Sequence, residues 1–210
     1  MKFLVTAGPT REPLDPVRYL SNRSSGKMGY ALAEAAQRAG HEVLLISGPT
    51  DLPIPAGVYY RRIETAEEML EAVKASILDR DCALFAAAVA DYRPAKMAYQ
   101  KIKKSADAMT LELERTPDIL GSMRALGYRG ALVGFAAETE DLPVNARSKL
   151  VKKGCDLIVA NDVSKIGIGF DVDHNAVTLV YADGREEDIP KMPKRELAEK
   201  LIGVCEKLVK

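Results

Sequence analysis

The sequence lacks an excess of charge of either sign. It contains 30 Lys and Arg residues and 30 Asp and Glu residues, so its formal net charge at pH 7 is zero. A protein without net positive charge offers no general attraction to nucleic acid or to an anionic membrane surface. We therefore expect neither as a partner, and any site for an anion must come from a local cluster.

Cysteine and histidine are scarce as well. Cys82, Cys155 and Cys205 do not have the spacing of metal ligands, so buried free thiols in a reducing cytoplasm explain them best. His41 and His174 have no partner at a spacing typical of a metal site or a catalytic triad. We assign no functional role to these residues and expect a cytoplasmic protein.

Long apolar runs are missing too. No segment approaches the length of a transmembrane helix, which argues against a membrane protein. The first residues are apolar only as far as the turn-forming pair Gly8 and Pro9, so we expect no signal peptide.

Short apolar segments alternate with helical patterns along most of the chain. Buried strands are expected at residues 3–6, 43–46, 83–89, 131–135 and 157–160. Helical spacing of apolar residues is found between them, at 30–39, 69–77, 117–126 and 144–153. This alternation predicts an α/β protein of the three-layer, Rossmann-like kind, with a mostly parallel sheet and helices on both faces. At 210 residues, we expect one domain spanning 1–210.

The last quarter of the chain has a different pattern. Residues 176–182 alternate apolar and polar and are followed by Asp183 and Gly184, a strong signal for a β-hairpin at about 175–190. A final helix is expected to open at Pro193. Residues 96–108 contain several lysines and no regular pattern, and we interpret them as a flexible flap.

The segment from Ser24 to Gly29 stands where a helix begins after the first strand. Backbone N–H groups at a helix start suit an anion, and glycines let a phosphate approach. It does not match a Walker A loop. Its glycines equally fit close packing of a helix on a strand. The long polar segment 9–25 before it carries Arg18 and Asn22, which are either site residues or ordinary solvated side chains.

Two further motifs allow both a functional and a structural interpretation. Small residues at 86–90 end on Asp91, an arrangement that lets a planar base lie against the backbone and offers a carboxylate for a cation. Close strand packing and a helix-capping Asp explain it equally well. Lysines at 101–104 on the flap could close over a polyphosphate, although such a run is usually a solvated face.

Lys149 and Lys153 lie one helical turn apart and therefore on one face of a helix. The strand before them ends at Phe135, whose ring either stacks on a base or packs in the core. Taken alone, the core position is favoured for Phe135.

Together, these segments resemble the bacterial phosphopantothenoylcysteine synthetases, ligases of coenzyme A synthesis. The resemblance covers nearly the whole chain in order. It rests on GPTREPLDPVRYLSNRSSGKMG at 8–29, AAVADYRP at 87–94, KIKK at 101–104, TPDIL at 116–120, VGFAAET at 133–139 and CDLIVANDVS at 155–164.

The resemblance implies a ligase that joins 4′-phosphopantothenate to L-cysteine through an acyl-cytidylate, with CTP converted to CMP and pyrophosphate and with Mg²⁺ as cofactor. It implies catalytic roles for Asn22, Lys101 and Arg18, and Asp91 as a metal ligand. The nucleotide-binding residues that it implies are Phe85, Ala86, Ala87, Asp91, Lys101, Thr116, Pro117, Asp118, Ile119, Phe135, Lys149 and Lys153.

The same resemblance implies a homodimer with active sites at the subunit interface. In many bacteria a flavin-dependent decarboxylase precedes this domain in one protein; we expect a separate decarboxylase to take the product here. Thr116 stands where the bifunctional proteins often have Asn, and Arg23 where some have His. Because animal relatives use ATP, these departures leave the choice of nucleotide open.

Two other classes of protein share some of these features. An NAD(P)-dependent oxidoreductase would have the same opening strand, loop and helix, but no acidic ribose ligand is evident after the second strand. A non-catalytic nucleotide-binding module would bind CTP without turnover.

Overall fold

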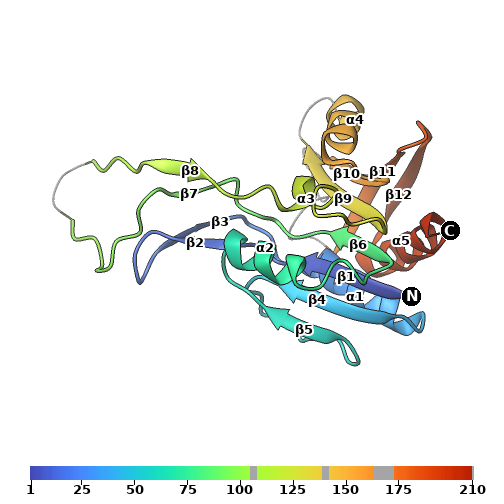
Figure 1. Ribbon diagram of the computed structural model, residues 1–210, viewed down its shortest axis with the longest axis horizontal. Helices are drawn as coiled ribbons and strands as arrows, with labels where there is room; N and C mark the ends of the chain where they lie inside the picture. Colours follow the sequence, from blue (N-terminus) through green and yellow to red (C-terminus); the bar gives the residue numbers. More distant parts are fainter. Residues whose placement is uncertain (105–107, 139–141, 163–172, 210) are drawn as a thin grey trace.

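A mixed β-sheet forms the centre of the computed structural model, which describes residues 1–104, 108–138, 142–162 and 173–209. Within these residues the sheet has eight strands in the order β12-β11-β10-β9-β6-β1-β4-β5. Their bounds are β1 Lys2–Ala7, β4 Glu42–Ser47, β5 Tyr59–Arg62, β6 Cys82–Phe85, β9 Ala131–Glu138, β10 Leu157–Asp162, β11 His174–Tyr181 and β12 Glu186–Pro193. Figure 1 shows this body and a long arm that extends from one end of it.

The six neighbouring strands from β5 across to β10 run parallel to one another, whereas β11 runs in the opposite direction to both of its neighbours. Each neighbouring pair from β5 across to β10 is in parallel register, whereas β11 pairs antiparallel with both β10 and β12. Strand β1 is buried at every position after Lys2, as expected for a parallel strand covered on both faces. The predicted parallel sheet and the C-terminal hairpin are both confirmed.

Helices cover both faces of the sheet. Helices α1 (Lys27–Arg38) and α5 (Lys194–Leu208) bury their apolar stripes in one core, together with Phe3 and Val5 of β1. Helices α2 (Ala66–Lys74), α3 (Ile119–Ser122) and α4 (Leu142–Lys153) bury theirs in a second core with Leu4. Since successive strand residues point to opposite faces, β1 contributes to both cores. The predicted three-layer, Rossmann-like architecture is therefore correct.

Two local features fix helix starts close to the sheet. The Thr65 side chain accepts a hydrogen bond from the Glu68 N–H, and the Glu68 carboxylate accepts one from the Thr65 N–H, so the capping box at the start of α2 is present. Near the start of α1, a Cβ added to Gly29 would lie 2.5 Å from the Cβ of Ala7. Gly29 is thus required for the close approach of α1 to β1.

Two short hairpins form the arm. Strand β2 (Arg11–Pro13) pairs with β3 (Tyr19–Ser21), and β7 (Tyr92–Pro94) pairs with β8 (Leu113–Arg115). The sequence predicted no strands here, because three-residue segments are too short to show a clear alternation and because proline in β2 and β7 argues against a strand.

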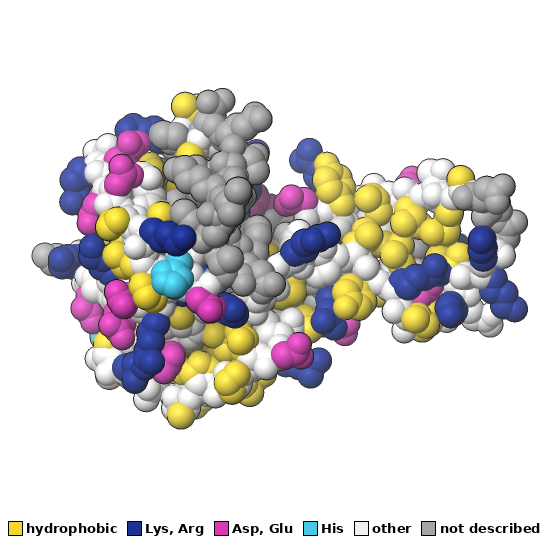
Figure 2. Space-filling view, turned by 180° about the vertical axis from the view of Figure 1, so that it is seen from behind, with side chains coloured by type: hydrophobic (Ala, Val, Ile, Leu, Met, Phe, Trp, Pro, Cys, Tyr) yellow, Lys and Arg dark blue, Asp and Glu magenta, His cyan; other side chains and the backbone are white. Residues whose placement is uncertain are grey.

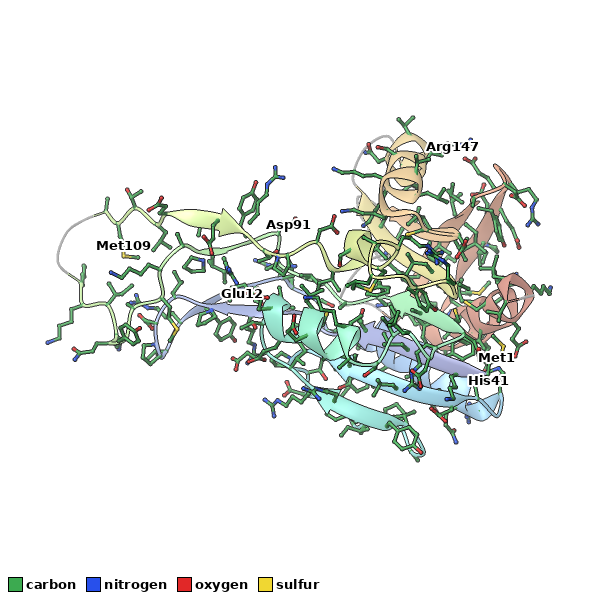
Figure 3. All side chains as sticks on the ribbon, viewed as in Figure 1. Met1, Glu12, His41, Asp91, Met109 and Arg147 are labelled. Carbon is green, nitrogen blue, oxygen red and sulfur yellow. The ribbon has the colours of Figure 1, made fainter. Side chains whose placement is uncertain are left out.

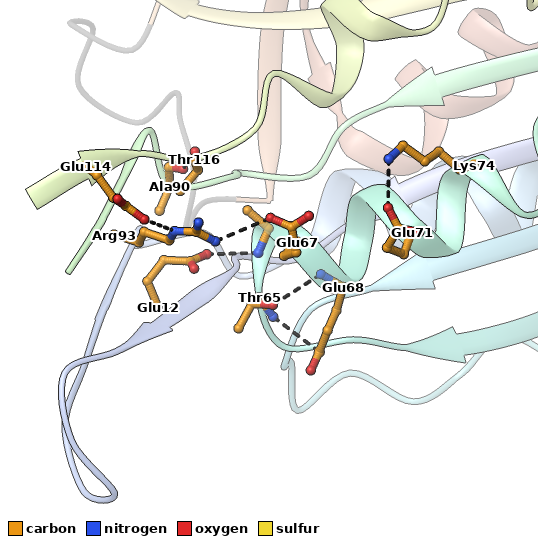
Figure 4. Close-up of polar contacts among 11 residues, drawn as sticks. Glu12, Thr65, Glu67, Glu68, Glu71, Lys74, Ala90, Arg93, Glu114 and Thr116 are labelled. Carbon is orange, nitrogen blue, oxygen red and sulfur yellow. Dashed lines mark hydrogen bonds and ion pairs between the residues drawn. The ribbon is translucent and has the colours of Figure 1, made fainter. Parts of the chain in front are cut away.

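The base of the arm is tied to α2 by polar contacts (Figure 4). Glu12 is buried, and its carboxylate accepts a hydrogen bond of 2.9 Å from the Ala66 N–H at the start of α2. Arg93 pairs with Glu114 across the hairpin at 2.8 Å and with Glu67 of α2 at 3.3 Å. These contacts set the direction in which the arm leaves the body.

In the body, two elements are much shorter than expected and one strand was not predicted. Strand β6 ends at Phe85 rather than Val89, since the following residues bond to the loop after β1, with the Ala88 N–H donating to the Gly8 carbonyl at 2.9 Å. The helix expected at 117–126 is only α3, and turns follow it as far as Gly127, which has a φ of 91°. Strand β5 lies at the exposed edge of the sheet, and its residues show no apolar pattern from which a strand could be predicted.

None of the helices built from the described residues has both the length and the apolar character needed to cross a membrane.

Candidate active site

A cleft of about 720 Å³ lies where several parallel strands end. It is lined by the loop before α1, the residues after β6, the segment from Arg115 to Leu120, and the end of β9. Helix α4 adds three lysines, and Asn161, Asn175 and Lys194 close one corner. In Figure 3, Asp91 is labelled where the arm joins the body, so the cleft opens beside the base of the arm. Ligands of α/β sheets bind at this edge.

One wall of the cleft is the backbone after β6, and the Asn22 side chain is hydrogen-bonded to it. The Asn22 side-chain nitrogen donates to the carbonyls of Ala88 and Val89, each at 3.1 Å. The Ala90 N–H donates to the Thr10 hydroxyl at 3.0 Å. The small side chains at 86–88 leave this wall flat and open to a ligand.

The start of α1 forms the floor. Its N-cap residue Gly26 has a φ of 78° and, being glycine, offers no side chain that could cap the helix. The first N–H groups of a helix have no partner within it, so these groups suit an anionic ligand. Lys27 also lines the cleft and pairs with Asp173 at 2.7 Å. A Cβ on Gly26 would lie 2.7 Å from the Thr50 methyl carbon, so glycine is needed here as well.

The opposite wall is held together by Asp118 and Lys153, which form an ion pair between α3 and α4. The Asp118 side chain also accepts a 3.0 Å hydrogen bond from the Gly121 N–H as the N-cap of α3. Burial opposes ionisation of Asp118, but the Lys153 ammonium and the Gly121 N–H outweigh it and lower the pKa of Asp118 below its ordinary value of 3.8. Asp118 is therefore a carboxylate at neutral pH.

Phe135, in the second half of β9, meets Lys149 of α4. The Lys149 ammonium donates to the Phe135 carbonyl at 2.7 Å. The Phe135 ring is half-buried, packs against the core below it, and still lines the cleft. The expected core position is thus confirmed, and stacking of the exposed part of the ring on a base stays a prediction. Lys149, Lys152 and Lys153 place three ammonium groups on one wall, which is an environment that favours a polyphosphate.

Most residues expected at the site come together in this cleft. The expected residues that line it are Asn22, Phe85, Ala86, Ala87, Asp91, Thr116, Pro117, Asp118, Ile119, Phe135, Lys149 and Lys153. Arg18 and Lys101 do not line it. Arg18 lies in the loop between β2 and β3, and Lys101 lies between β7 and β8, so both belong to the arm. The part of the flap at 105–107 lies outside the described residues.

Sequence reasoning missed Arg115, Asn161, Asn175 and Lys194, which also line the cleft. The side-chain oxygens of Asn161 and Asn175 are buried and find no hydrogen-bond partner among the described residues. An Asn directly after the apolar run 157–160 was a usable signal for the first of them, because buried polar groups normally need a partner.

Asp91 offers an exposed carboxylate in the cleft. Groups of three or more His, Cys, Asp or Glu arranged for a metal ion do not occur in the part of the chain that the structure describes. Mg²⁺ usually takes only one or two protein carboxylates and completes its shell with substrate phosphates and water. The single carboxylate of Asp91 fits that mode of binding.

The covered parallel sheet and the lysine-rich cleft at its carboxyl edge define a Rossmann-like α/β protein whose cleft is suited to an anionic ligand. Residues 1–208 match the family described as the DNA/pantothenate metabolism flavoprotein C-terminal domain, and the chain belongs to this family.

Named relatives agree with this assignment. The chain is 49% identical over 210 residues to the coenzyme A biosynthesis bifunctional protein CoaBC of Vibrio vulnificus (strain CMCP6), covering 99% of this chain and 52% of that protein. It is 47% identical over 206 residues to CoaBC of Escherichia coli K12, covering 96% and 50%. The chain thus spans about half the length of these relatives.

A solved structure with the same architecture is the crystal structure of the C-terminal domain of the coenzyme A biosynthesis bifunctional protein CoaBC. It is 41% identical to this chain and superimposes with a TM-score of 0.85, covering 99% of this chain and 95% of that one. The similarity therefore includes the arm as well as the body.

Proposed function

We propose that residues 1–210 form one phosphopantothenate–cysteine ligase domain of coenzyme A synthesis. The observation that carries this proposal is the cleft, which gathers residues from five of the six motif segments in one place. The high coverage of a solved CoaBC C-terminal domain supports it. The alternatives, an NAD(P)-dependent oxidoreductase and a non-catalytic nucleotide-binding module, gain no support from the relatives described above.

The proposed reaction has two steps. A phosphopantothenate carboxylate oxygen attacks the α-phosphorus of CTP, and pyrophosphate leaves, giving an acyl-cytidylate. The cysteine amine then attacks the acyl carbon and loses a proton, and CMP leaves as the amide forms. The protein takes no covalent part, so catalysis consists of positioning the reactants and neutralising negative charge.

The cleft residues fit these tasks. Lys149 and Lys153 lie on the wall where a triphosphate would need cations, and the flat backbone at 86–88 accommodates a planar base. Asn22 is fixed by its two bonds to the wall, where it can meet the acyl-cytidylate. When bound through Asp91, Mg²⁺ would offset charge on the phosphates.

A homodimer explains why Arg18 and Lys101 lie outside the cleft of their own chain. We propose that the arm of one chain brings both residues to the cleft of a second copy. Figure 2 shows many apolar side chains over the surface of the arm. The large apolar residues that are exposed there are Val17, Tyr19, Tyr92, Met97, Tyr99, Met109, Leu111 and Leu113. An exposed apolar surface of this kind is typical of an interface.

The hairpin of β11 and β12 is less suitable than the arm as the pairing surface of a dimer. Strand β11 is already paired on both sides, and the outer strand β12 is exposed at most positions and carries Glu186, Glu187 and Asp188. Charged edge strands resist pairing with another sheet.

The proposed function is tested by measuring pyrophosphate release from CTP and phosphopantothenate, with and without cysteine. We expect about one equivalent of pyrophosphate per site without cysteine and steady turnover with it. Release of phosphate instead of pyrophosphate, or no release with either CTP or ATP, would contradict the proposal. A higher kcat/KM with ATP than with CTP would contradict only the choice of nucleotide.

A further inference from the structure

Asp15 is a buried carboxylate in the loop between β2 and β3 of the arm. Its side chain has no exposed surface, whereas the Arg18 side chain beside it is 44% exposed. One carboxylate oxygen accepts the N–H groups of Val17 and Arg18, each at 2.9 Å. The other accepts the Arg18 guanidinium through Nε at 3.0 Å and Nη2 at 2.6 Å, and also the Ile102 N–H at 3.1 Å.

These contacts join two segments that are far apart in the sequence. The guanidinium of Arg18 also donates to the Ile102 carbonyl at 2.9 Å, so Asp15, Arg18 and Ile102 form a closed ring of hydrogen bonds. Beside this ring, the Ala98 N–H donates to the Leu14 carbonyl at 2.9 Å. The loop between β2 and β3 is thereby fixed to the segment between β7 and β8.

The ring needs a carboxylate in particular. The pKa of Asp15 lies well below its ordinary value, mainly because the Arg18 side chain donates hydrogen bonds to it. The Asp15 carboxylate is therefore charged at neutral pH. Its two oxygens receive five donors. Asparagine has one acceptor oxygen and two donors, so it would turn an N–H group toward the guanidinium or toward the backbone N–H groups.

We propose that Asp15 is a positioning residue of the ligase, which holds Arg18 and the segment carrying Lys101 as one unit. Lys101 directly precedes Ile102, whose N–H and carbonyl are both fixed by the ring. Asp15 does not line the cleft and touches no reactant. It ensures that the guanidinium and the ammonium reach the cleft of the second chain at a fixed separation. This inference rests on the proposed function, since it concerns two residues expected to act in that reaction.

The kinetic test compares Asp15→Asn with Glu112→Gln, a change of the same kind at an exposed position elsewhere on the arm. We expect Asp15→Asn to lower kcat by about 10- to 100-fold, because small displacements of a catalytic group have effects of this size. The dissociation constant for CTP should change little, since the wall and floor of the cleft come from other elements. Glu112→Gln should match the wild type.

A double-mutant cycle separates positioning from a general loss of structure. If Asp15 acts through Arg18, the pair Asp15→Asn and Arg18→Gln should lose little more activity than Arg18→Gln alone. The proposal would be overturned if the two substitutions lowered activity independently, so that their effects multiplied in the double variant. It would also be overturned if Asp15→Asn left kcat unchanged.

Hydrogen exchange tests the same ring without any need for activity. In the wild type the Ile102 amide should be protected, and Asp15→Asn should speed its exchange while the core strands keep theirs. If Asp15→Asn does not fold, Arg18→Lys serves instead, because lysine keeps the charge and loses the paired bonds. An unprotected Ile102 amide in the wild type, or unchanged protection in the variant, overturns this inference. Absence of ligase activity with an intact ring overturns only the proposed function.

Discussion

Asn22 and Lys101 differ in chemistry and in location. Asn22 is an uncharged group fixed to the cleft wall by two hydrogen bonds, whereas Lys101 is a cation carried on the arm. A carboxamide can donate and accept hydrogen bonds but cannot neutralise a polyphosphate. The two residues should therefore serve different steps of the reaction.

We expect Lys101→Gln to slow pyrophosphate release by about 10²- to 10³-fold, the effect of removing one group that stabilises developing charge. Asn22→Ala should still release pyrophosphate but react slowly with cysteine, so that the acyl-cytidylate accumulates. Mass spectrometry of the quenched reaction detects this intermediate directly. Its accumulation in Lys101→Gln and not in Asn22→Ala would reverse the two assignments.

The ion pair of Asp118 with Lys153 should appear in the pH dependence of stability. The folded pKa of Asp118 is below the ordinary 3.8, so its contribution is present above the unfolded pKa and is lost as the pH falls through the folded pKa. Asparagine caps a helix as well as aspartate does, so Asp118→Asn removes mainly the charge. We expect it to lower the free energy of unfolding by only about 0.5 kcal/mol, because the Asp118 side chain is 54% exposed.

Denaturant titrations of the wild type and Asp118→Asn at several pH values measure this contribution. The difference between them should be constant from neutral pH down to about pH 5 and should shrink below about pH 4. A difference that grows on acidification would mean that the carboxylate is destabilising in the folded protein.

At the scale of elements, α1 depends on one glycine for its contact with the sheet. Because an added Cβ at Gly29 would meet β1 at 2.5 Å, we expect Gly29→Ala to lower the free energy of unfolding by about 1–3 kcal/mol. It should also raise KM for CTP, because the start of α1 forms the cleft floor. Gly203→Ala is a matched control in α5, where an added Cβ meets nothing within 4 Å.

In the control, the better helix propensity of alanine should raise the free energy of unfolding by about 0.5–1 kcal/mol, without a change in KM. Equal destabilisation by both substitutions would show that close packing at Gly29 is not the cause.

Elements with strong local signals could be predicted from the sequence. Fully buried runs such as residues 3–6 predicted the parallel strands, and Asp183 with Gly184 predicted the turn of the C-terminal hairpin. The arm could not be predicted, because β2 and β7 are held by pairing and by long-range contacts such as Glu12 to Ala66. Asn175 and Lys194 reach the cleft only through the register of β11 and β12, which local patterns do not encode.

At the scale of the whole molecule, the separation of arm and cleft predicts complementation between inactive variants. In a heterodimer of Lys101→Gln and Lys149→Gln chains, one cleft keeps its own Lys149 and receives an intact Lys101 from its partner. With random mixing, about one quarter of all sites should regain activity. If Lys101 serves its own chain, every cleft keeps one lesion and no activity returns.

The arm also has a consequence for how the protein responds to its own concentration. A single chain holds the complete wall and floor of the cleft but keeps Arg18 and Lys101 elsewhere. Dilution below the dissociation constant of the dimer should therefore abolish turnover while a chain on its own still binds nucleotide, because dimerisation follows mass action. Specific activity would then rise with protein concentration, and the amount of protein in the cell would set the activity of each molecule as well as the number of molecules.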